Sequence, residues 1–282
     1  MYRSHPLLNE LIDLAIKEDI GDGDHSSLGA IAPGTFGRAR LLVKDSGILA
    51  GMEVAELITE KIDPDLKMHS LLKDGDKIHV GDIAFTLEGS VHSILQAERL
   101  LLNFMQRMSG IATHTKRLVD IIEGTKARLL DTRKTSPGMR VVEKWAVKIG
   151  GAENHRFGLY DMVLLKDNHI DYAGGVIPAI ESTVSYLKSR EKDLAIEVET
   201  RNIKEVEQAL STGVVDRIMF DNFSPEMMAH AVEVVNGVCE TEASGGITEK
   251  TIRSFAETGV DFISVGALTH SVKSLDLSLK EY

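Results

Sequence analysis

Residues 131–170 read DTRKTSPGMRVVEKWAVKIGGAENHRFGLYDMVLLKDNHI, and their pattern decides how the rest of the chain can be interpreted. An apolar run ends at Asp131, a helix is expected over 137–149, and a second apolar run ends at Leu165. The expected helix has Ser136 as N-cap and one buried face, formed at i, i+3, i+4 and i+7 by Val142, Trp145, Ala146 and Ile149. Alternating strand and helix predicts a parallel sheet covered by helices.

Cations gather in this stretch, although the whole chain has a formal net charge of -11. They lie where the apolar runs stop: Arg133 and Lys134 follow the first run, His155 and Arg156 precede the second, and Lys166 ends it. Guanidinium and ammonium groups at neighbouring strand ends suit a ligand with several negative charges. The alternative is that these cations form a solvated basic surface, because most runs of charged residues face solvent.

The composition is that of an ordinary globular protein, with 282 residues, 43% hydrophobic and 27% charged. The length allows one large or two medium domains. No apolar run reaches the roughly 20 residues that a membrane-spanning helix needs, and the first residues lack the pattern of a signal peptide. The single Cys239 cannot form an internal disulfide. We therefore expect a cytoplasmic protein, and its acidity argues against nucleic acid as a partner.

The first part of the chain is expected to form a small α/β domain over residues 1–108. Short strands alternate with turn dipeptides between residues 37 and 89, interrupted by one helix over 52–62. An amphipathic helix follows over 93–108, and Gly110 is expected to end it. The C-terminal tail, 271–282, is expected to pack with this domain.

Beyond residue 124 strands and helices alternate, which predicts an α/β barrel over 109–270. The expected strands are 127–131, 162–167, 195–199, 217–221, 238–244 and 262–266, and the expected helices are 137–149, 174–187, 203–211, 225–235 and 250–258. Each strand ends in a polar residue or a glycine: Asp131, Lys166, Glu199, Asp221, Ser244 and Gly266. In a barrel these ends converge on one axis and form the active site, whereas an open sheet would distribute them along an edge.

Two groups of strand-end residues predict binding of phosphate and of a hard cation. Ser244-Gly245-Gly246, before a helical region near Thr248, and Gly266-Ala267 let backbone N–H groups approach a phosphate. Glu199 and Asp221 end successive strands, where carboxylates with substrate phosphates are typical ligands of Mg²⁺. We expect Glu197 to alternate with Glu199 and to face the helices.

Five long motifs carry a family resemblance: DTRKTSPG, GGAENHRFGLYDMVLLKDNHI, FDNFSPE, EASGGIT and GVDFISVGALTHS. In this order, and with KEDIGDGDHSS near the N-terminus, they closely resemble the quinolinate phosphoribosyltransferases (decarboxylating nicotinate-nucleotide pyrophosphorylases). The resemblance covers nearly the whole chain. It implies the type II phosphoribosyltransferase fold, a small α/β domain with an open α/β barrel. One conservative departure is Phe220, where leucine is usual.

The resemblance also implies a reaction and a set of roles. Quinolinate and phosphoribosyl pyrophosphate would give nicotinate mononucleotide, CO2 and pyrophosphate in NAD biosynthesis, with Mg²⁺. The residues that match the dicarboxylate ligands are Arg133, Lys134, His155 and Arg156. Those that match the ribose-phosphate, pyrophosphate and metal side are Lys166, Glu199, Asp221, Ser244, Gly245, Gly246, Gly266 and Ala267. Arg99 matches an arginine that acts in the partner's site of a homodimer, and Leu95, Leu102 and Met105 would pack at that interface or inside their own domain.

The implied mechanism requires no covalent nucleophile. The ring nitrogen attacks the anomeric carbon as pyrophosphate leaves, Lys134 and Lys166 offset the leaving-group charge, and Glu199 and Asp221 stabilise the cationic ribose. Three alternatives remain: a phosphoribosyltransferase of this fold that acts on another acid without decarboxylation, a Schiff-base aldolase with Lys166 as its lysine, and a non-enzymatic binding scaffold.

Overall fold

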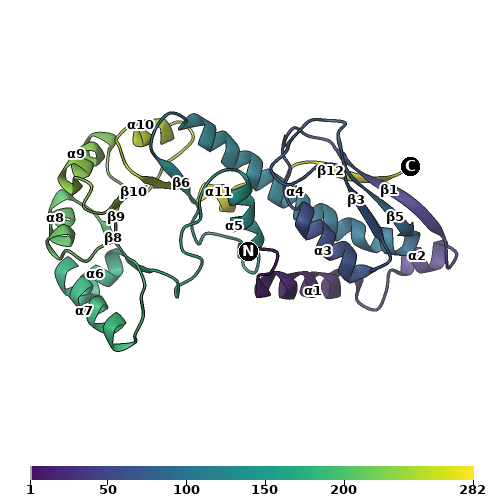
Figure 1. Ribbon diagram of the computed structural model, residues 1–282, viewed down its shortest axis with the longest axis horizontal. Helices are drawn as coiled ribbons and strands as arrows, with labels where there is room; N and C mark the ends of the chain where they lie inside the picture. Colours follow the sequence, from purple (N-terminus) through teal and green to yellow (C-terminus); the bar gives the residue numbers. More distant parts are fainter. Residues whose placement is uncertain (1) are drawn as a thin grey trace. The chain divides into compact units, whose positions relative to one another are not determined.

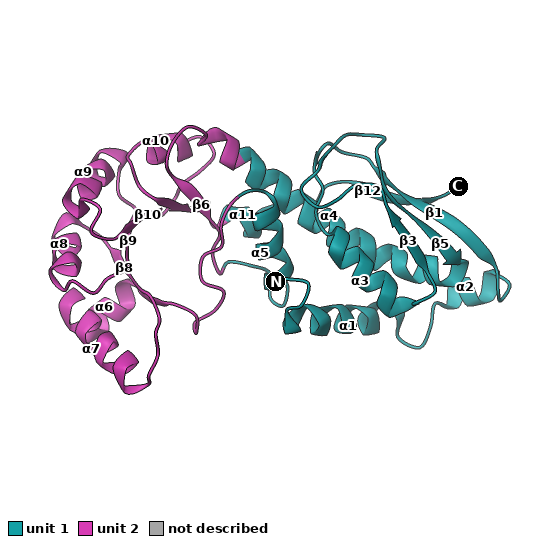
Figure 2. Ribbon diagram, viewed as in Figure 1, with its two compact units in different colours: residues 1–117, 134–151, 267–282 teal, residues 118–133, 152–266 magenta. Residues whose placement is uncertain are grey.

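The computed structural model describes residues 2–282, which divide into two compact units (Figure 2). Unit 1 holds residues 2–117, 134–151 and 267–282, and unit 2 holds 118–133 and 152–266. Helix α4 (Val91–Ile121) contributes to both units. The expected boundary between residues 108 and 109 falls inside α4, and the division into 1–108 and 109–270 stays a prediction.

The expectation that Gly110 ends a helix is wrong, because α4 continues through it to Ile121. Gly110 has a different role. A Cβ atom at this position would lie against the carbonyl oxygen of Lys273. The glycine therefore permits a backbone segment from the other end of the chain to pack directly on α4.

Unit 1 is built on a four-stranded antiparallel sheet in the order β12-β1-β5-β3 (Figure 1). Its strands are β1 (Phe36–Val43), β3 (Lys67–Ser70), β5 (Ile83–Ser90) and β12 (Leu277–Glu281). The short strands β2 (Gly47–Ile48) and β4 (Lys77–Ile78) form a separate pair. The tail strand β12 pairs with β1 from Leu277 to Glu281. The C-terminal residues thus complete the sheet of the N-terminal part of the chain.

The helices of unit 1 include three from the N-terminal part, α1 (Pro6–Ile20), α2 (His25–Ala30) and α3 (Met52–Ile62). Two more come from later segments, α5 (Arg140–Ile149) and α11 (Ala267–His270). Helix α5 begins three residues after the predicted start, because Gly138 has a left-handed φ of 81° and interrupts the helical backbone. The one expected buried face is also too narrow, since every residue from Val141 to Val147 is buried.

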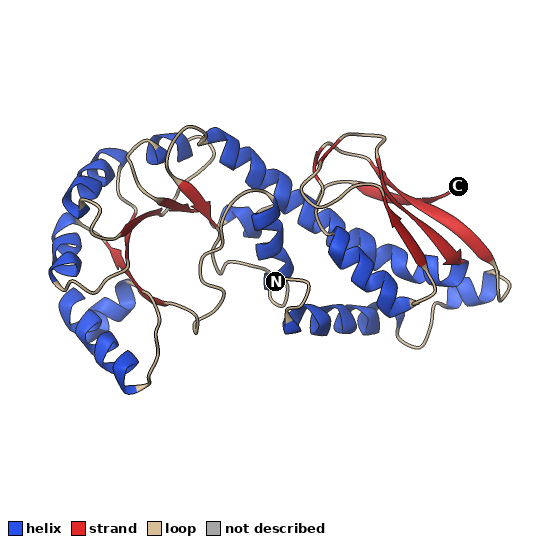
Figure 3. Cartoon of the chain, in the orientation of Figure 1, coloured by secondary structure: helices blue, strands red, loops and turns tan. Residues whose placement is uncertain are grey.

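Unit 2 contains a six-stranded, all-parallel sheet in the order β6-β11-β10-β9-β8-β7. Its strands are β6 (Arg128–Leu130), β7 (Val163–Leu165), β8 (Ile196–Thr200), β9 (Arg217–Asp221), β10 (Glu240–Ser244) and β11 (Phe262–Ser264). The helices of unit 2 are α6 (Asp167–Ala173), α7 (Val176–Ser189), α8 (Ile203–Ser211), α9 (Pro225–Val235) and α10 (Ile252–Ala256). They follow the outside of the curved sheet (Figure 3). The predicted α/β class with an open parallel barrel is confirmed.

The two faces of this sheet differ in chemistry. Val198, Ile218, Phe220, Ala243 and Ile263 alternate with the charged residues and are completely buried, as expected for the face that packs on the helices. Glu197 and Glu199 share the other face, because residues two apart on a strand point the same way. The expectation that Glu197 turns away from Glu199 is therefore wrong. The inner face of the barrel is lined with charged side chains.

Candidate active site

Arg133 and Arg156 are both half-buried, and the positive charge of Arg133 acts on Arg156. The pKa of Arg156 is lowered, first by burial of its guanidinium and next by the positive charge of Arg133. Arg156 Nη1 donates to the carbonyl oxygen of Met162 at 3.2 Å, which fixes the side chain. Two like charges held this close, away from full solvation, repel each other. An anion bound between them would relieve that repulsion.

Asp131 holds the two motifs that carry these arginines together. It is completely buried, and its Oδ1 accepts from the backbone N–H of His155 at 2.9 Å. Its Oδ2 accepts from the side-chain amide of Asn154 at 2.6 Å. In addition, a parallel bridge pairs Leu130 with Glu153. The segment 152–155 therefore runs alongside β6, and Arg133 and Arg156 follow two adjacent backbone segments.

His155 contacts buried carboxylates inside the barrel. Its Nε2 lies 2.9 Å from Glu197 and 3.5 Å from Glu242, and both glutamates are completely buried. Its Nδ1 accepts from the backbone N–H of Arg156 at 2.7 Å, so the ring proton is on Nε2. The ligand atoms of this trio lie within 4.8 Å of one another, close enough for a metal ion. A metal would need the Nε2 lone pair, and the tautomer that the hydrogen bond to Nδ1 implies has a proton there instead.

The glutamates of this trio have strongly raised pKa values. Burial raises the pKa of Glu242 to about 8, and the charge of Glu197 adds to the effect. Burial likewise raises the pKa of Glu197 to about 7, against the attraction of Arg217. Arg217 contacts both a buried and an exposed glutamate. Its Nη1 lies 3.1 Å from Oε2 of the buried Glu242, and its Nη2 lies 2.7 Å from Oε2 of the exposed Glu240. At neutral pH the two buried carboxyl groups therefore share about one proton.

This shared proton predicts how stability varies with pH. Unfolded glutamates lose their protons near pH 4.5, whereas the folded pair retains one up to about pH 8. The folded protein therefore binds more protons over that range, and its free energy of unfolding should fall as pH rises from 5 to 8. Glu242→Gln should flatten this fall, measured as the midpoint of urea unfolding between pH 5 and 9. Glu240→Gln, on the same strand, should retain it, and equal slopes in the two variants would contradict the assignment.

Lys166 and Glu199 form the second part of the site. Lys166 follows β7, and its Nζ lies 3.1 Å from Glu199 on the neighbouring strand β8. Its backbone N–H donates to Nδ1 of His169 at 2.9 Å. Glu199 is 6% exposed, whereas Lys166 projects further into solvent. An aldolase lysine must attack as a neutral amine, so this ammonium–carboxylate pair disfavours the Schiff-base alternative.

Asp221 ends β9, the next strand, and lies on the same face as Glu199. The backbone register pairs Met219 with Glu199 and Asp221 with Ser244 of β10. The Oδ2 atom of Asp221 accepts from the side chain of Asn222 at 2.7 Å. Two carboxylates on adjacent strands, one of them half-buried, form the hard oxygen donor set that Mg²⁺ uses together with substrate phosphates. The residues therefore fit the expected metal.

The loop after β10 is shaped so that backbone can approach a ligand closely. Gly245 has a φ of 95°, and a Cβ atom there would lie 2.6 Å from Cγ of Asn222. Gly246 has a φ of 61° with open space around it. Successive N–H groups in such a conformation form an anion-binding concavity. The expected helix start near Thr248 is wrong: residues 248–251 form a turn, and the short α10 begins at Ile252.

The remaining predicted site residues are distributed between the units. Gly266, after β11, is the last residue of unit 2, and Ala267 begins α11 in unit 1. Lys134 is exposed in unit 1, next to Arg133 in the sequence, and its carbonyl oxygen accepts from the hydroxyl of Thr269 at 2.9 Å. Arg99 is exposed on α4, and its side chain makes no ion pair or hydrogen bond with residues 2–282. Exposed arginines often form an ion pair within their own chain, and the side chain of Arg99 forms none with residues 2–282.

Sequence reasoning missed three charged residues that form buried ion pairs or lie inside the barrel. Glu242 and Arg217 lie on the inner face of the barrel, and Arg107 binds the buried Glu143 at 2.8 Å. The signal for the first two was present: in the strand sequence ETEAS, glutamates alternate with small residues, which fits a buried face carrying charge. Arg107 gave no such signal, since a polar position on an amphipathic helix usually faces solvent.

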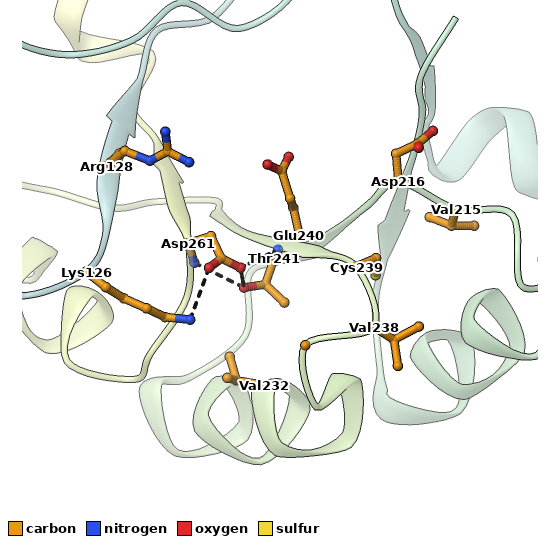
Figure 4. Close-up of a pocket in the computed structure, with 11 residues that line it drawn as sticks. Lys126, Arg128, Val215, Asp216, Val232, Val238, Cys239, Glu240, Thr241 and Asp261 are labelled. Carbon is orange, nitrogen blue, oxygen red and sulfur yellow. Dashed lines mark hydrogen bonds and ion pairs between the residues drawn. The ribbon is translucent and has the colours of Figure 1, made fainter.

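A cavity of about 460 Å³ lies at the opposite, amino-terminal edge of the parallel sheet (Figure 4). Its charges are paired within the protein: Lys126 lies 3.0 Å from Asp261, and Arg217 lies 2.7 Å from Glu240. Burial and nearby acids raise the pKa of the Cys239 thiol to about 11, so it is protonated at neutral pH and a poor nucleophile. Polar residues at this edge of a barrel usually serve stability.

Comparisons with known proteins agree with this geometry. The model of the quinolinate phosphoribosyl transferase C-terminal domain matches residues 111–280, and that of the N-terminal domain matches 24–109. The chain is 47% identical to "Quinolinate phosphoribosyltransferase [decarboxylating] 1b" of Nicotiana tabacum, over 98% of this chain and 83% of that protein. It is 39% identical to "Probable nicotinate-nucleotide pyrophosphorylase [carboxylating]" of Bacillus subtilis, over 98% and 94%.

Solved structures give the same result. NadC from Streptococcus pyogenes superposes with a TM-score of 0.92 at 36% identity and covers 98% of this chain and 97% of its own. The nicotinate-nucleotide pyrophosphorylase from Francisella tularensis superposes with a TM-score of 0.88 at 39% identity, over 98% and 96%. In residues 2–282, no helix is both long and apolar enough to cross a membrane. The chain belongs to the quinolinate phosphoribosyl transferase family.

Proposed function

We propose that this chain transfers the phosphoribosyl group of phosphoribosyl pyrophosphate to quinolinate, with loss of CO2, to form nicotinate mononucleotide for NAD biosynthesis. The observation that supports this substrate is the pair Arg133 and Arg156. The positive charge of Arg133 acts on Arg156, and the guanidinium of Arg156 is partly desolvated. A dicarboxylate fits such a pair because each planar guanidinium can bind one carboxylate with two hydrogen bonds. Lys134 is exposed next to Arg133 and extends the positive region.

In this proposal, Lys166, Glu199 and Asp221 act on the ribose and pyrophosphate. The quinolinate nitrogen attacks the anomeric carbon of the ribose. The bond between that carbon and pyrophosphate breaks at the same time, so positive charge develops on the ribose. The carboxylates of Glu199 and Asp221 stabilise that charge, and Lys134 and Lys166 stabilise the negative charge of the leaving group. Lys166 now contacts Glu199 at 3.1 Å, and a bound pyrophosphate would compete for its ammonium group.

Mg²⁺ is the proposed cofactor, held by Glu199 and Asp221 with substrate oxygens completing its shell. When bound, it would neutralise charge on the departing pyrophosphate. The backbone N–H groups of Gly245 and Gly246 would bind the ribose 5-phosphate, and Ser244, Gly266 and Ala267 are the other residues proposed to bind it. The positive φ angles of Gly245 and Gly246 allow their backbone to approach a phosphate closely.

Decarboxylation follows from the product of the first step. Once ribosylated, the ring nitrogen is cationic, and its charge stabilises the electron pair that stays on the adjacent ring carbon when the carboxylate leaves as CO2. A proton from water then binds to that carbon, and the protein's part is to position the ring. His155 was expected to bind a carboxylate, but its ring contacts Glu197 and Glu242. Its role toward quinolinate stays a prediction.

Release of labelled CO2 from carboxyl-labelled quinolinate tests the function directly. We expect release only when phosphoribosyl pyrophosphate and Mg²⁺ are both present. Transfer to a pyridine acid without CO2 release would favour the alternative of a non-decarboxylating phosphoribosyltransferase. Borohydride inactivation at Lys166 would favour the aldolase.

The cytoplasmic location expected from the sequence stays a prediction.

We also propose a homodimer in which Arg99 completes the partner's site. Arg99 is exposed on α4 without an ion pair to residues 2–282. Near it, a hollow of about 370 Å³ is lined by charged and apolar residues, and two of the apolar ones are exposed: Phe36, which is 67% exposed, and Leu95, which is 38% exposed. Leu102 and Met105 are buried within their own chain and are not available for the interface. A two-fold contact would cover this apolar surface.

Mixing two inactive variants tests this arrangement. Arg99→Ala and Lys166→Ala proteins should each be nearly inactive. In a heterodimer one site carries both changes and the other carries neither, so activity should return to about half of the wild-type value per heterodimer. Native mass spectrometry would count the heterodimers. Mixing Lys166→Ala with Asp221→Ala is the control, because each site then retains one lesion and activity should stay absent. Heterodimers of Arg99→Ala and Lys166→Ala without activity would place Arg99 outside the partner's site.

A further inference from the structure

Arg107, in the middle of α4, is bound to two segments that lie far apart in the sequence. Its Nη2 donates to the carbonyl oxygen of Thr269 at 2.7 Å and to Oγ of Ser136 at 3.4 Å. Its Nε and Nη2 donate to Oε1 of Glu143 at 3.2 and 2.8 Å. One guanidinium group therefore contacts the loop before α5, helix α5 itself and α11. All of these residues lie in unit 1.

Glu143 completes the arrangement from the other side. Its side chain is fully buried, and its Oε2 accepts from the backbone N–H of Ser136 at 3.2 Å. A buried carboxylate is costly unless it is paired and hydrogen-bonded, so Glu143 depends on Arg107 and Ser136 together. A lysine at position 107 has one nitrogen and could not contact Glu143, Ser136 and Thr269 in the same planar geometry.

The contacts of Arg107 and Glu143 also affect the backbone at Lys134. The hydroxyl of Thr269 donates to the carbonyl oxygen of Lys134 at 2.9 Å, and Ser136 lies two residues further along the same loop. The backbone is thus anchored at Lys134 and at Ser136 by groups that Arg107 and Glu143 hold. The Lys134 side chain itself remains exposed.

We infer that Arg107, Glu143 and Thr269 are positioning residues that hold the Lys134 loop for catalysis. The inference rests on the proposed function, which gives Lys134 a role in stabilising the leaving group. Because such stabilisation appears in the transition state, loosening the loop should lower kcat and leave the KM value of phosphoribosyl pyrophosphate nearly unchanged. A merely structural role would instead lower thermal stability without this separation of kcat from KM.

The first test removes one hydrogen bond. Thr269→Val keeps the approximate shape and loses the hydroxyl that binds Lys134, so kcat should fall about tenfold, as for a misplaced catalytic group. Thr269→Ser retains the hydroxyl and should restore kcat to within about twofold. Arg107→Lys should lower kcat about 30-fold, whereas Arg117→Lys, on the exposed side of the same helix, should have no effect. Equal kcat values for Thr269→Val and Thr269→Ser would overturn the inference.

The second test is a double-mutant cycle with Lys134→Ala. If Thr269 acts through Lys134, adding Thr269→Val to Lys134→Ala should lower kcat by less than about twofold further. Full additivity of the two effects would overturn the positioning role while leaving the role of Lys134 intact. Wild-type kcat in Lys134→Ala alone would instead overturn the role that the proposed function gives to Lys134. Thermal melting of every variant would verify that the compared proteins are folded.

Discussion

Replacement of Arg133 by lysine is expected to lower kcat/KM for quinolinate about 100-fold or more. The charge is preserved, but a lysine offers one ammonium group where the guanidinium offers a planar pair of donors. Loss of a charge-assisted bidentate contact costs about 3 kcal/mol, which corresponds to a change of this size. Most of the loss should appear in the affinity for quinolinate, measured by calorimetry with the enzyme alone.

The matched control is Arg128→Lys, five residues earlier at the start of β6. Arg128 forms an exposed ion pair with Glu153 at 2.9 Å and begins β6 at its amino-terminal end, and its replacement should leave turnover almost unchanged. Near-normal quinolinate turnover in a folded Arg133→Lys protein would show that Arg133 does not bind the dicarboxylate.

Asp221→Asn should lower kcat by at least about 100-fold while quinolinate alone still binds with nearly wild-type affinity. The amide keeps the shape of the side chain and its contact with Asn222, but it removes a negative charge from the proposed metal and ribose side. Stabilisation of transition-state charge in a partly buried site accounts for effects of this size. The measurements are single-turnover kinetics over a range of Mg²⁺ concentrations and calorimetry with quinolinate.

A suitable control is Asp171→Asn on α6, where an exposed aspartate lies 3.0 Å from Arg201. It removes the same charge from the same unit and should change kcat less than about twofold. If Asp221→Asn abolished quinolinate binding and left the dependence on Mg²⁺ unaltered, Asp221 would belong to the dicarboxylate side of the site.

Local signals in the sequence predicted some elements of the barrel to the residue. Helix α9 begins after Ser224, whose Oγ accepts from the backbone N–H of Met227, and Pro225 takes the first helical position. Helix α8 begins after Asn202, whose side chain accepts from Glu205. Such caps and the apolar periodicity are encoded within a few residues, so they are visible without the fold. The cation cluster was visible for the same reason, because Arg133 and Arg156 flank strand-like runs.

Contacts between distant segments were not visible. Gly110 was interpreted as a helix end, yet it serves the close approach of Lys273, which lies far along the chain. Glu242 and Glu197 were not expected inside the barrel, because only the parallel register brings them to His155. The error about Glu197 was of another kind, since the period of two along a strand already places it beside Glu199.

The pairing of β12 with β1 has a consequence for folding order. Strand β1 comes from the beginning of the chain and β12 from its end, so the ribosome releases the second partner only after the barrel sequence has been synthesised. Until then, β1 presents an unpaired edge that could associate with another chain. The segment 24–109, which matches the N-terminal family model, would lack β12 and should aggregate when produced alone. The closure of a long loop between the two strands is also expected to make completion of this sheet a late step.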